Sequence, residues 1–434
     1  MGFFLFLYNV FLPLGILIAS PVLLLWILVS PKTRAGFWQK LGCLQPRFVS
    51  QIQGLSKHKK RVWVHAVSVG EFNAIRPLIL ELQNHYAVVI STTTKTSQDL
   101  ANRVFPDLPI FYFPFDFRPC VQTALKLIRP DLILITETEI WPNFIDMAGR
   151  VFKTPVFLIN GRVSKHSYKG YRFIQPLLSA VLRHVRHFYM QTQADADRIK
   201  SLGTLPHEVV TVTGNLKFDI NPVIDPVQRQ ILAHQLGVET GDTVLVFAST
   251  HSGEDEPMMA LYSRMRKDFP DLKVILAPRH PERLNEIKSI ISNKSLTYSV
   301  RSTLSESNPN EQPLVVLDTI GELLTVYSLA TVAIMGGSFS EKGGQNPLEP
   351  ISQRIPVVMG PDMSNFTVIS RMILDNNAGY QVKSAPDIVG VLTELLTQPD
   401  IYGRVVENGQ QLLENNRGAK EILLVAIDTV LNPE

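Results

Sequence analysis

Residues 335–350 read Met335-Gly336-Gly337-Ser338-Phe339-Ser340-Glu341-Lys342-Gly343-Gly344-Gln345-Asn346-Pro347-Leu348-Glu349-Pro350 and directly follow the apolar run 329–335. This order predicts a buried strand, a glycine-rich turn and a helix that begins near Pro347. Glycines let backbone N–H groups approach phosphate closely, and a helix N-terminus favours an anion. The stretch is typical of a nucleotide-sugar pocket, with Glu349 placed for a ribose diol. The alternative is a plain turn followed by an acidic first helical turn.

The same order of apolar run, polar turn and helical stretch recurs along the chain, which is typical of parallel α/β sheets. In such sheets ligands bind at the carboxyl ends of the strands, so the residues after each run are candidates for function. The runs of a first set end at Val67, Ile90, Phe113, Ile135, Ile159 and Val212, and those of a second set end at Phe247, Leu276, Leu317, Met335 and Val358.

The length of 434 residues favours two domains, because a single core of this size is unusual. The polar segment 215–222 separates the two sets of runs. We therefore predict an α/β protein with two doubly wound, Rossmann-like lobes that face each other across a cleft. The predicted parts are a membrane anchor at 1–30, an N-terminal acceptor-binding lobe at 31–218 and a C-terminal nucleotide-sugar-binding lobe at 219–434.

Composition and missing motifs exclude several classes of protein. A net charge of +3 is too small for a dedicated nucleic-acid binder, and two cysteines make no disulfide framework. The chain has neither the G-x-G-x-x-G of a dinucleotide-binding dehydrogenase after its first strand nor a P-loop. No zinc-type His/Cys spacing occurs, and Asp195-Ala196-Asp197 is predicted to open a helix rather than bind a metal. We expect no metal or other cofactor.

The N-terminal segment 3–29 carries no charged side chain. As a helix it would be about 40 Å long and could cross a bilayer, although Pro13 and Pro21 could also leave it in one leaflet. The positive-inside rule then predicts that the rest of the chain is cytoplasmic. The basic residues that follow the segment are Lys32, Arg34, Lys40 and Arg47.

Two groups of carboxylates follow strands of the first set. Glu71 lies at a predicted strand-to-helix turn, where it could act as a general base or complement the helix dipole. Glu137 and Glu139 follow a buried strand and would lie on the same side of an extended chain. They could bind a polyol, orient a cation or cap the next helix.

The segment 162–173 interleaves cations with aromatics, which suits RNA, a lipid head group or a phosphorylated acceptor, or else is a solvated basic face. Next to an anchor, we favour a phosphorylated lipid.

Polar turns also follow four runs of the second set, at 248–256, 278–283, 318–323 and 336–349. Arg279 can neutralise a phosphate or carboxylate, and the backbone of 320–322 can meet a base. Asn346 and Glu349 can hold phosphate and ribose. Each turn taken alone could be a helix cap. Together on one edge of a sheet, they favour a nucleotide site.

These motifs together resemble the 3-deoxy-D-manno-octulosonic acid (Kdo) transferases of Gram-negative bacteria, which are inner-membrane enzymes that glycosylate the lipid A precursor. The resemblance extends over nearly the whole chain. Its most specific parts are Ser68-Val69-Gly70-Glu71 and the segments 136–143, 160–164, 214–219, 278–281, 336–339 and 346–350.

The resemblance implies a GT-B fold, CMP-Kdo as donor, the tetraacylated lipid A precursor as acceptor, and inversion at the anomeric carbon without a metal. It implies that Glu71 is the general base and that Glu139 and Lys217 stabilise the transition state. The implied CMP-Kdo contacts are Pro278, Arg279, Ile320, Gly321, Glu322, Asn346, Pro347, Leu348 and Glu349. Two alternatives stay open: a GT-B-like nucleotide-sugar epimerase, which leaves the anchor and the basic segment unexplained, and a catalytically silent, membrane-tethered nucleotide-binding protein.

Overall fold

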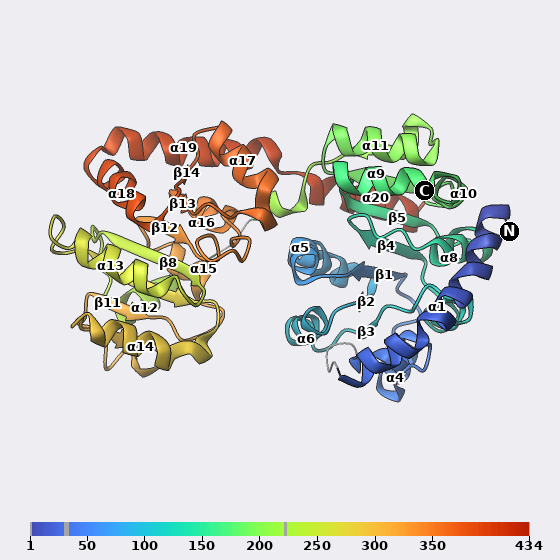
Figure 1. Ribbon diagram of the computed structural model, residues 1–434, viewed down its shortest axis with the longest axis horizontal. Helices are drawn as coiled ribbons and strands as arrows, with labels where there is room; N and C mark the ends of the chain where they lie inside the picture. Colours follow the sequence, from blue (N-terminus) through green and yellow to red (C-terminus); the bar gives the residue numbers. More distant parts are fainter. Residues whose placement is uncertain (1, 30–33, 221–223, 434) are drawn as a thin grey trace. The chain divides into compact units, whose positions relative to one another are not determined.

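A computed structural model of the protein describes residues 2–29, 34–220 and 224–433 (Figure 1). The chain divides into two compact units. The N-terminal unit comprises Met1–Asp219 and Asn416–Glu434, and the C-terminal unit comprises Ile220–Asn415. Each unit is built on one parallel sheet with helices on its faces, which confirms the predicted fold class of two doubly wound α/β lobes.

The N-terminal unit contains a seven-stranded parallel sheet in the order β3-β2-β1-β4-β5-β6-β7. Its strands are β1 Arg61–Ala66, β2 Ala87–Thr92, β3 Ile110–Tyr112, β4 Leu132–Thr136, β5 Val156–Gly161, β6 His187–Met190 and β7 Val210–Val212. Its helices include α1 Phe3–Val29, α3 Phe37–Lys40, α4 Pro46–Gly54, α5 Val69–His85, α6 Lys95–Val104, α7 Arg118–Ile128, α8 Pro142–Ile145, α9 Lys165–Phe173, α10 Gln175–Leu182, α11 Gln193–Gly203 and α20 Ala419–Leu431. The chain order reverses between β1 and β4, the kind of position where open α/β sheets bind ligands.

The central strands of this sheet are buried on both faces, which explains their nearly continuous apolar runs. Along β1, Trp63 points into a core with Phe111 and Phe144. Its neighbours Val62 and Val64 point into a second core on the other face. The polar residues of these strands lie near the strand ends, and most of them, including His65, Ser91 and Thr136, are buried there.

The C-terminal unit repeats this plan, with a parallel sheet in the order β10-β11-β9-β8-β12-β13-β14. Its strands are β8 Val244–Thr250, β9 Lys273–Pro278, β10 Ser299–Val300, β11 Leu314–Val316, β12 Val332–Met335, β13 Val357–Met359 and β14 Tyr380–Gln381. Its helices are α12 Pro226–Gln235, α13 Asp255–Met265, α14 Leu284–Asn293, α15 Leu323–Tyr327, α16 Leu348–Ser352, α17 Thr367–Asp375, α18 Ile388–Thr397 and α19 Pro399–Asn416. Strand β12 and helix α16 flank the glycine-rich turn, so the predicted helix near Pro347 is present.

The last residues correct the predicted C-terminal lobe of 219–434, because 416–434 belong to the N-terminal unit. Helix α20 buries an apolar stripe, including Leu423 and Ile427, in the same core as α5. The carboxylate of Asp219 accepts hydrogen bonds from the N–H groups of Gly418, at 2.7 Å, and Lys420, at 2.6 Å. Figure 1 shows the red C-terminal helix among the blue and green elements of this unit. Burial of this stripe therefore brings the chain end back to the first sheet.

Helix α1 is, among residues 2–29, 34–220 and 224–433, the one helix long and apolar enough to cross a membrane. Pro13 and Pro21 both lie inside it without ending it. Of the basic residues predicted to follow the anchor, Lys32 lies outside the described residues.

Candidate active site

Glu71 lies in the first turn of α5, at the predicted strand-to-helix turn after β1. The Ser68 hydroxyl donates to Glu71 Oε1 at 2.8 Å, and its oxygen accepts the Glu71 N–H at 3.3 Å. The Val67 N–H donates to Glu71 Oε2 at 2.9 Å. Glu71 is only 8% exposed. The carboxylate is thus held in a buried position by groups at the start of the helix.

Glu137 and Glu139 follow β4 in a turn rather than in an extended segment. Glu137 has a φ of 57°, in the left-handed region that residues with a Cβ rarely adopt. Its N–H donates to the carbonyl of Ile159 at 2.9 Å. The chain is therefore not extended at Glu137, so the extended geometry that would place both carboxylates on one side is absent. Strained backbone of this kind clusters at functional sites.

Burial raises the pKa values of Glu71, Glu137 and Glu139, which we call the acidic cluster. For Glu71, burial is the largest cause; the Val67 N–H opposes it and the charge of Glu137 adds to it. For Glu139, burial and then the charge of Glu71 raise the pKa to about 7, while the Trp141 side chain opposes the shift. Because the three carboxylates influence one another, they form one electrostatic group.

Lys217 and Arg162 supply positive charge to the acidic cluster. Burial lowers the pKa of Lys217, while the negative charges of Glu137 and Glu71 act in the opposite direction. The positive charges of Lys217 and Arg162 in turn oppose the effect of burial on the pKa of Glu137. The structure therefore brings together all three residues that the resemblance implied for catalysis, namely Glu71, Glu139 and Lys217, and adds Glu137 and Arg162.

Two asparagines hold the backbone at Lys217, which lies in the short 3-10 helix Leu216–Phe218. Asn215 Oδ1 accepts the Lys217 N–H at 3.0 Å. Asn160 Oδ1 accepts the Leu216 N–H at 3.0 Å, and Asn160 itself has a φ of 50° at the end of β5. Neither asparagine was among the predicted site residues. For Asn160, the signal was an asparagine directly after the apolar run that ends at Ile159, because Asn is among the few residues that tolerate positive φ.

The Asp195-Ala196-Asp197 motif opens α11, as predicted. Asp195 is buried, and its Oδ1 accepts the Val163 N–H at 2.9 Å. The carboxylate thereby fixes the chain next to Arg162. This motif positions the loop after β5.

In the part of the chain that the structure describes, no group of three or more His, Cys, Asp and Glu residues is arranged to hold a metal ion.

The glycine-rich turn of the C-terminal unit differs from its prediction, because a carboxylate of the protein already occupies two of its N–H groups. Glu254, at the start of α13, accepts from the N–H groups of Gly337 at 2.8 Å and Phe339 at 2.9 Å. It also accepts from the His251 N–H at 2.8 Å. Glu254 is 1% exposed. The turn is therefore a rigid element held by an internal anion, and these two N–H groups are not open to a phosphate.

Arg279, Asn346 and Glu349 lie together after β9 and β12. The Asn346 side chain donates to Glu349 Oε1 at 3.3 Å and accepts the Leu348 N–H at 3.2 Å. Burial raises the pKa of Glu349, while Asn346 and the positive charge of Arg279 oppose the shift. Arg279 is exposed, and its N–H donates to the Thr250 carbonyl at 2.9 Å. The predicted contacts Pro278, Pro347 and Leu348 are buried beside these polar groups.

The segment Ile320, Gly321 and Glu322 follows β11. Ile320 is 74% exposed, and Gly321 has a φ of 98° that strains any other residue. The Glu322 carboxylate is paired with Arg301 at 2.8 Å. The side chain of Glu322 therefore has an internal partner. The contact of this segment's backbone with a base stays a prediction.

Comparisons with known proteins show the family to which the chain is similar. Residues 35–220 match the family described as 3-Deoxy-D-manno-octulosonic-acid transferase (kdotransferase). The chain is 31% identical to the 3-deoxy-D-manno-octulosonic acid transferase of Haemophilus influenzae, over 94% of this chain and 95% of the relative. It is 30% identical to the enzyme of that name from Bordetella pertussis, over 94% of this chain and 96% of the relative.

Solved structures support the fold. The UDP-GlcNAc 2-epimerase of Neisseria meningitidis matches with a TM-score of 0.56 and 14% identity, over 85% of this chain and 99% of that chain. At this identity the likeness shows a shared GT-B-like fold and does not favour the epimerase alternative. The relatives named above are enzymes, which argues against a silent nucleotide-binding protein. The chain belongs to the family of 3-deoxy-D-manno-octulosonic acid (Kdo) transferases and is a glycosyltransferase.

Proposed function

We propose that this enzyme transfers Kdo from CMP-Kdo to a hydroxyl group of the tetraacylated lipid A precursor, with inversion and with Glu71 as the general base. The observation that carries this proposal is the acidic cluster, in which Glu71 and Glu139 interact but have different environments. Hydrogen bonds favour the charged form of Glu71, whereas burial raises the pKa of Glu139 to about 7, so the two carboxyl groups can serve as proton acceptor and hydrogen-bond donor.

Glu71 fits the role of the base. The Val67 N–H and the Ser68 hydroxyl stabilise its charged form against the effect of burial. A carboxylate has about four lone-pair sites, so these hydrogen bonds leave it able to accept a proton. As the acceptor oxygen forms its bond to the anomeric carbon of Kdo, its proton passes to Glu71. The bond between that carbon and the CMP phosphate breaks on the opposite face, and its electron pair leaves with CMP.

Glu139 and Lys217 fit the role of transition-state stabilisers. With a pKa of about 7, Glu139 keeps its proton over part of the neutral range and can donate a hydrogen bond to an oxygen of the reacting sugar. Lys217 can stabilise the negative charge that develops on the leaving phosphate. Its buried position strengthens this interaction, because little water screens it.

The C-terminal unit is the proposed site for CMP-Kdo. Arg279 can pair with the phosphate, and the Asn346 and Glu349 side chains can bind the ribose hydroxyl groups. The proposed contacts also include Pro278, the segment 320–322, Pro347 and Leu348. The support for this assignment is family membership together with the position of all these residues at strand ends or the turns that follow strands of one sheet.

The proposed location is the inner membrane, with both units in the cytoplasm. One support is the apolar helix α1. The other is α9, in which no basic or aromatic side chain is buried and the last residue, Phe173, is 89% exposed. A C-terminal alkaline phosphatase fusion should be inactive and a C-terminal fluorescent fusion bright. The opposite pattern would reverse this topology.

The reaction itself is tested with purified enzyme, CMP-Kdo and the tetraacylated lipid A precursor, followed by mass spectrometry. We expect lipid products heavier by the mass of one or more Kdo residues, with equal release of CMP, and undiminished transfer in excess EDTA. Conversion of the donor without any acceptor would favour an epimerase. Binding of CMP with no turnover of any lipid acceptor would favour a silent binding protein.

A further inference from the structure

Helix α1 has two parts with different surroundings. In its first three turns, Leu5 is 2% exposed and Tyr8, Asn9, Leu12 and Pro13 are partly buried, at the spacing of one helical face. From residue 14 to residue 19, every side chain position is exposed. The first part therefore packs on the N-terminal unit, against α10 among other elements, and the second part projects from it.

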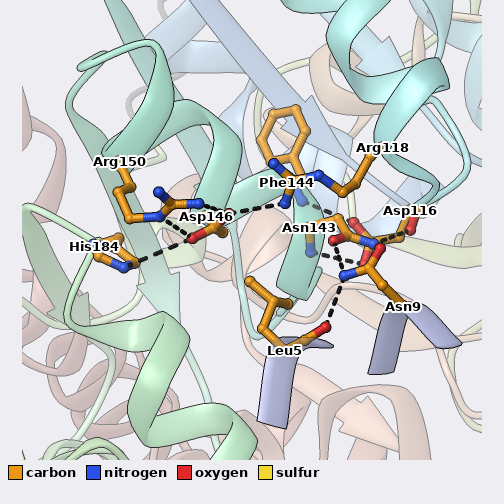
Figure 2. Close-up of polar contacts among 9 residues, drawn as sticks. All are labelled: Leu5, Asn9, Asp116, Arg118, Asn143, Phe144, Asp146, Arg150 and His184. Atoms are coloured by element: carbon orange, nitrogen blue, oxygen red, sulfur yellow. Dashed lines mark hydrogen bonds and ion pairs between the residues drawn. The ribbon is translucent and has the colours of Figure 1, made fainter. Parts of the chain in front are cut away.

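Polar side chains bind this first part to the unit (Figure 2). Asn9 Nδ2 donates to Asn143 Oδ1 at 2.8 Å and to the Leu5 carbonyl at 2.8 Å. The Tyr8 hydroxyl donates to Asp116 Oδ2 at 2.9 Å. We call Tyr8, Asn9, Asp116 and Asn143 the anchor clasp. Asn143 is fully buried and Asp116 nearly so, which makes an unpaired polar atom here costly.

The anchor clasp also caps α8. Asp116 Oδ2 accepts the Asn143 N–H at 3.0 Å, and Asp116 Oδ1 accepts the Phe144 N–H at 2.8 Å. The Asn143 side chain donates to the Asp116 carbonyl at 2.8 Å. Trp141, the N-cap residue of α8, supplies no side-chain cap of its own. The first turn of α8 is therefore held by Asp116, and Asp116 and Asn143 are in turn held by α1.

The position of α8 links this contact to the acidic cluster. The loop 137–141 carries Glu137 and Glu139; β4 fixes one end of it and α8 fixes the other. Glu137 already has strained backbone, so this loop keeps its conformation only while both ends are held. A small displacement of catalytic groups can lower a rate by about 100-fold.

We propose that Asn9 is a positioning residue: through the anchor clasp, the apolar N-terminal helix fixes the loop that presents Glu139, and so acts as part of the catalytic unit and not only as a tether. This inference rests on the proposed function, because it uses the role of Glu139 in transfer. It also explains a feature of the sequence. An asparagine in an apolar helix is unfavourable toward lipid, but here it meets a buried amide.

The test compares Asn9→Leu with Ser20→Leu in the full-length enzyme, assayed in detergent micelles that hold enzyme and acceptor together. Both changes make α1 more apolar, but the Ser20 hydroxyl donates within its own helix, to the Leu17 carbonyl at 2.7 Å. We expect Asn9→Leu to lower kcat about 10-fold to 100-fold, with the KM for CMP-Kdo within about twofold of the parent. Ser20→Leu should keep the parent kcat. Equal kcat values for the two variants would overturn the proposal.

Hydrogen exchange provides a readout that is independent of turnover. The amides of Asn143 and Phe144 should exchange faster in Asn9→Leu than in Ser20→Leu, and unchanged protection would contradict the clasp. Tyr8→Phe removes only one hydroxyl and should produce the same effects to a lesser degree, which keeps the test valid if Asn9→Leu folds poorly. If the parent enzyme transfers no Kdo while Asn9→Leu still loses protection, the proposed function fails and the clasp stands.

Discussion

The two units present their charged side chains differently at the strand ends. In the N-terminal unit, burial raises the pKa values of three carboxyl groups, and the charge of Glu137 adds to the shifts of Glu71 and Glu139. In the C-terminal unit, carboxylates have fixed internal partners: Glu254 binds backbone N–H groups, Asp255 pairs with Arg283, and Glu322 pairs with Arg301. The comparison suggests that the first sheet holds reactive groups at the expense of stability, whereas the second provides a rigid surface for binding.

The largest expected effect on stability comes from removing the Glu254 carboxylate, the internal anion of the C-terminal unit. Glu254→Ala leaves one buried and two partly buried N–H groups without their acceptor and should lower the free energy of unfolding of this unit by about 3–5 kcal/mol. Denaturation followed by circular dichroism measures the loss. Tryptophan fluorescence gives an internal reference, because Trp26, Trp38, Trp63 and Trp141 all precede residue 220.

The matched control is Glu256→Ala, two residues further along the chain. Its side chain is 73% exposed and lies 3.9 Å from Lys294. We expect a change within about 0.5 kcal/mol. If Glu254→Ala were as mild as this control, the glycine-rich turn would not depend on an internal anion, and its N–H groups would again be candidates for phosphate.

Arg279→Ala should weaken CMP binding by about 1–3 kcal/mol, because a charged hydrogen-bond partner of the phosphate is lost. The expected loss is moderate because Arg279 is exposed in the structure and solvent screens its charge. Calorimetric titration with CMP measures it. Arg371→Ala removes an equally positive but 83% exposed side chain of the same unit and should leave the affinity unchanged. Equal affinities of the two variants would remove Arg279 from the site.

The pH dependence of transfer tests the division of roles in the acidic cluster. Activity should rise with pH as Glu71 loses its proton, and fall as pH passes about 7 and Glu139 loses its proton. Glu139→Gln keeps a hydrogen-bond donor at every pH, so the alkaline fall should disappear. A pH profile with the same alkaline limb in this variant would show that another group causes it.

The raised pKa of Glu139 also makes the stability of the N-terminal unit fall as pH rises. A carboxyl group whose pKa is raised on folding stabilises the fold below its unfolded pKa and loses that contribution as pH rises through the folded value. For Glu139 the loss falls between the ordinary glutamate pKa of 4.5 and about 7. The N-terminal unit of the parent should therefore lose more stability over this range than that of Glu139→Gln.

The smallest expected effect concerns the return of the chain end. Asp219→Ala removes the acceptor of two N–H groups at the start of α20 and should cost the N-terminal unit about 1–2 kcal/mol. Limited proteolysis should then cut near residue 418 more readily. Asp197→Ala, which removes an exposed carboxylate of α11, is the control. Equal resistance of both variants would mean that apolar packing alone holds α20.

The fold was largely predictable because its central strands are buried on both faces and read as apolar runs. The strands that sequence reasoning missed, β6, β10 and β14, have only two to four residues, which is too short to give a clear apolar run. The assignment of residues 416–434 to the C-terminal lobe was wrong because α20 has an ordinary amphipathic pattern. Nothing in that pattern tells which of two similar sheets it covers.

The candidate site was predictable to the extent that its residues lie directly after strands. Glu71, Glu139 and Lys217 could be named from their motifs, but the turn at Glu137 could not, since it depends on a hydrogen bond to β5. Glu254 was read as part of a helix start. Its partners Gly337 and Phe339 lie more than 80 residues away, and only the folded sheet brings them to it.

The most direct test of the account is the rate of Kdo transfer by Glu71→Gln, compared with Glu81→Gln on the exposed face of the same helix. The glutamine keeps the shape of the side chain and cannot take the proton of the acceptor hydroxyl. We predict a loss of about 10²–10⁴-fold in kcat for Glu71→Gln, with normal CMP binding, and parent activity for Glu81→Gln. A folded Glu71→Gln enzyme that transfers Kdo within about tenfold of the parent rate would contradict the assignment of Glu71 as the base.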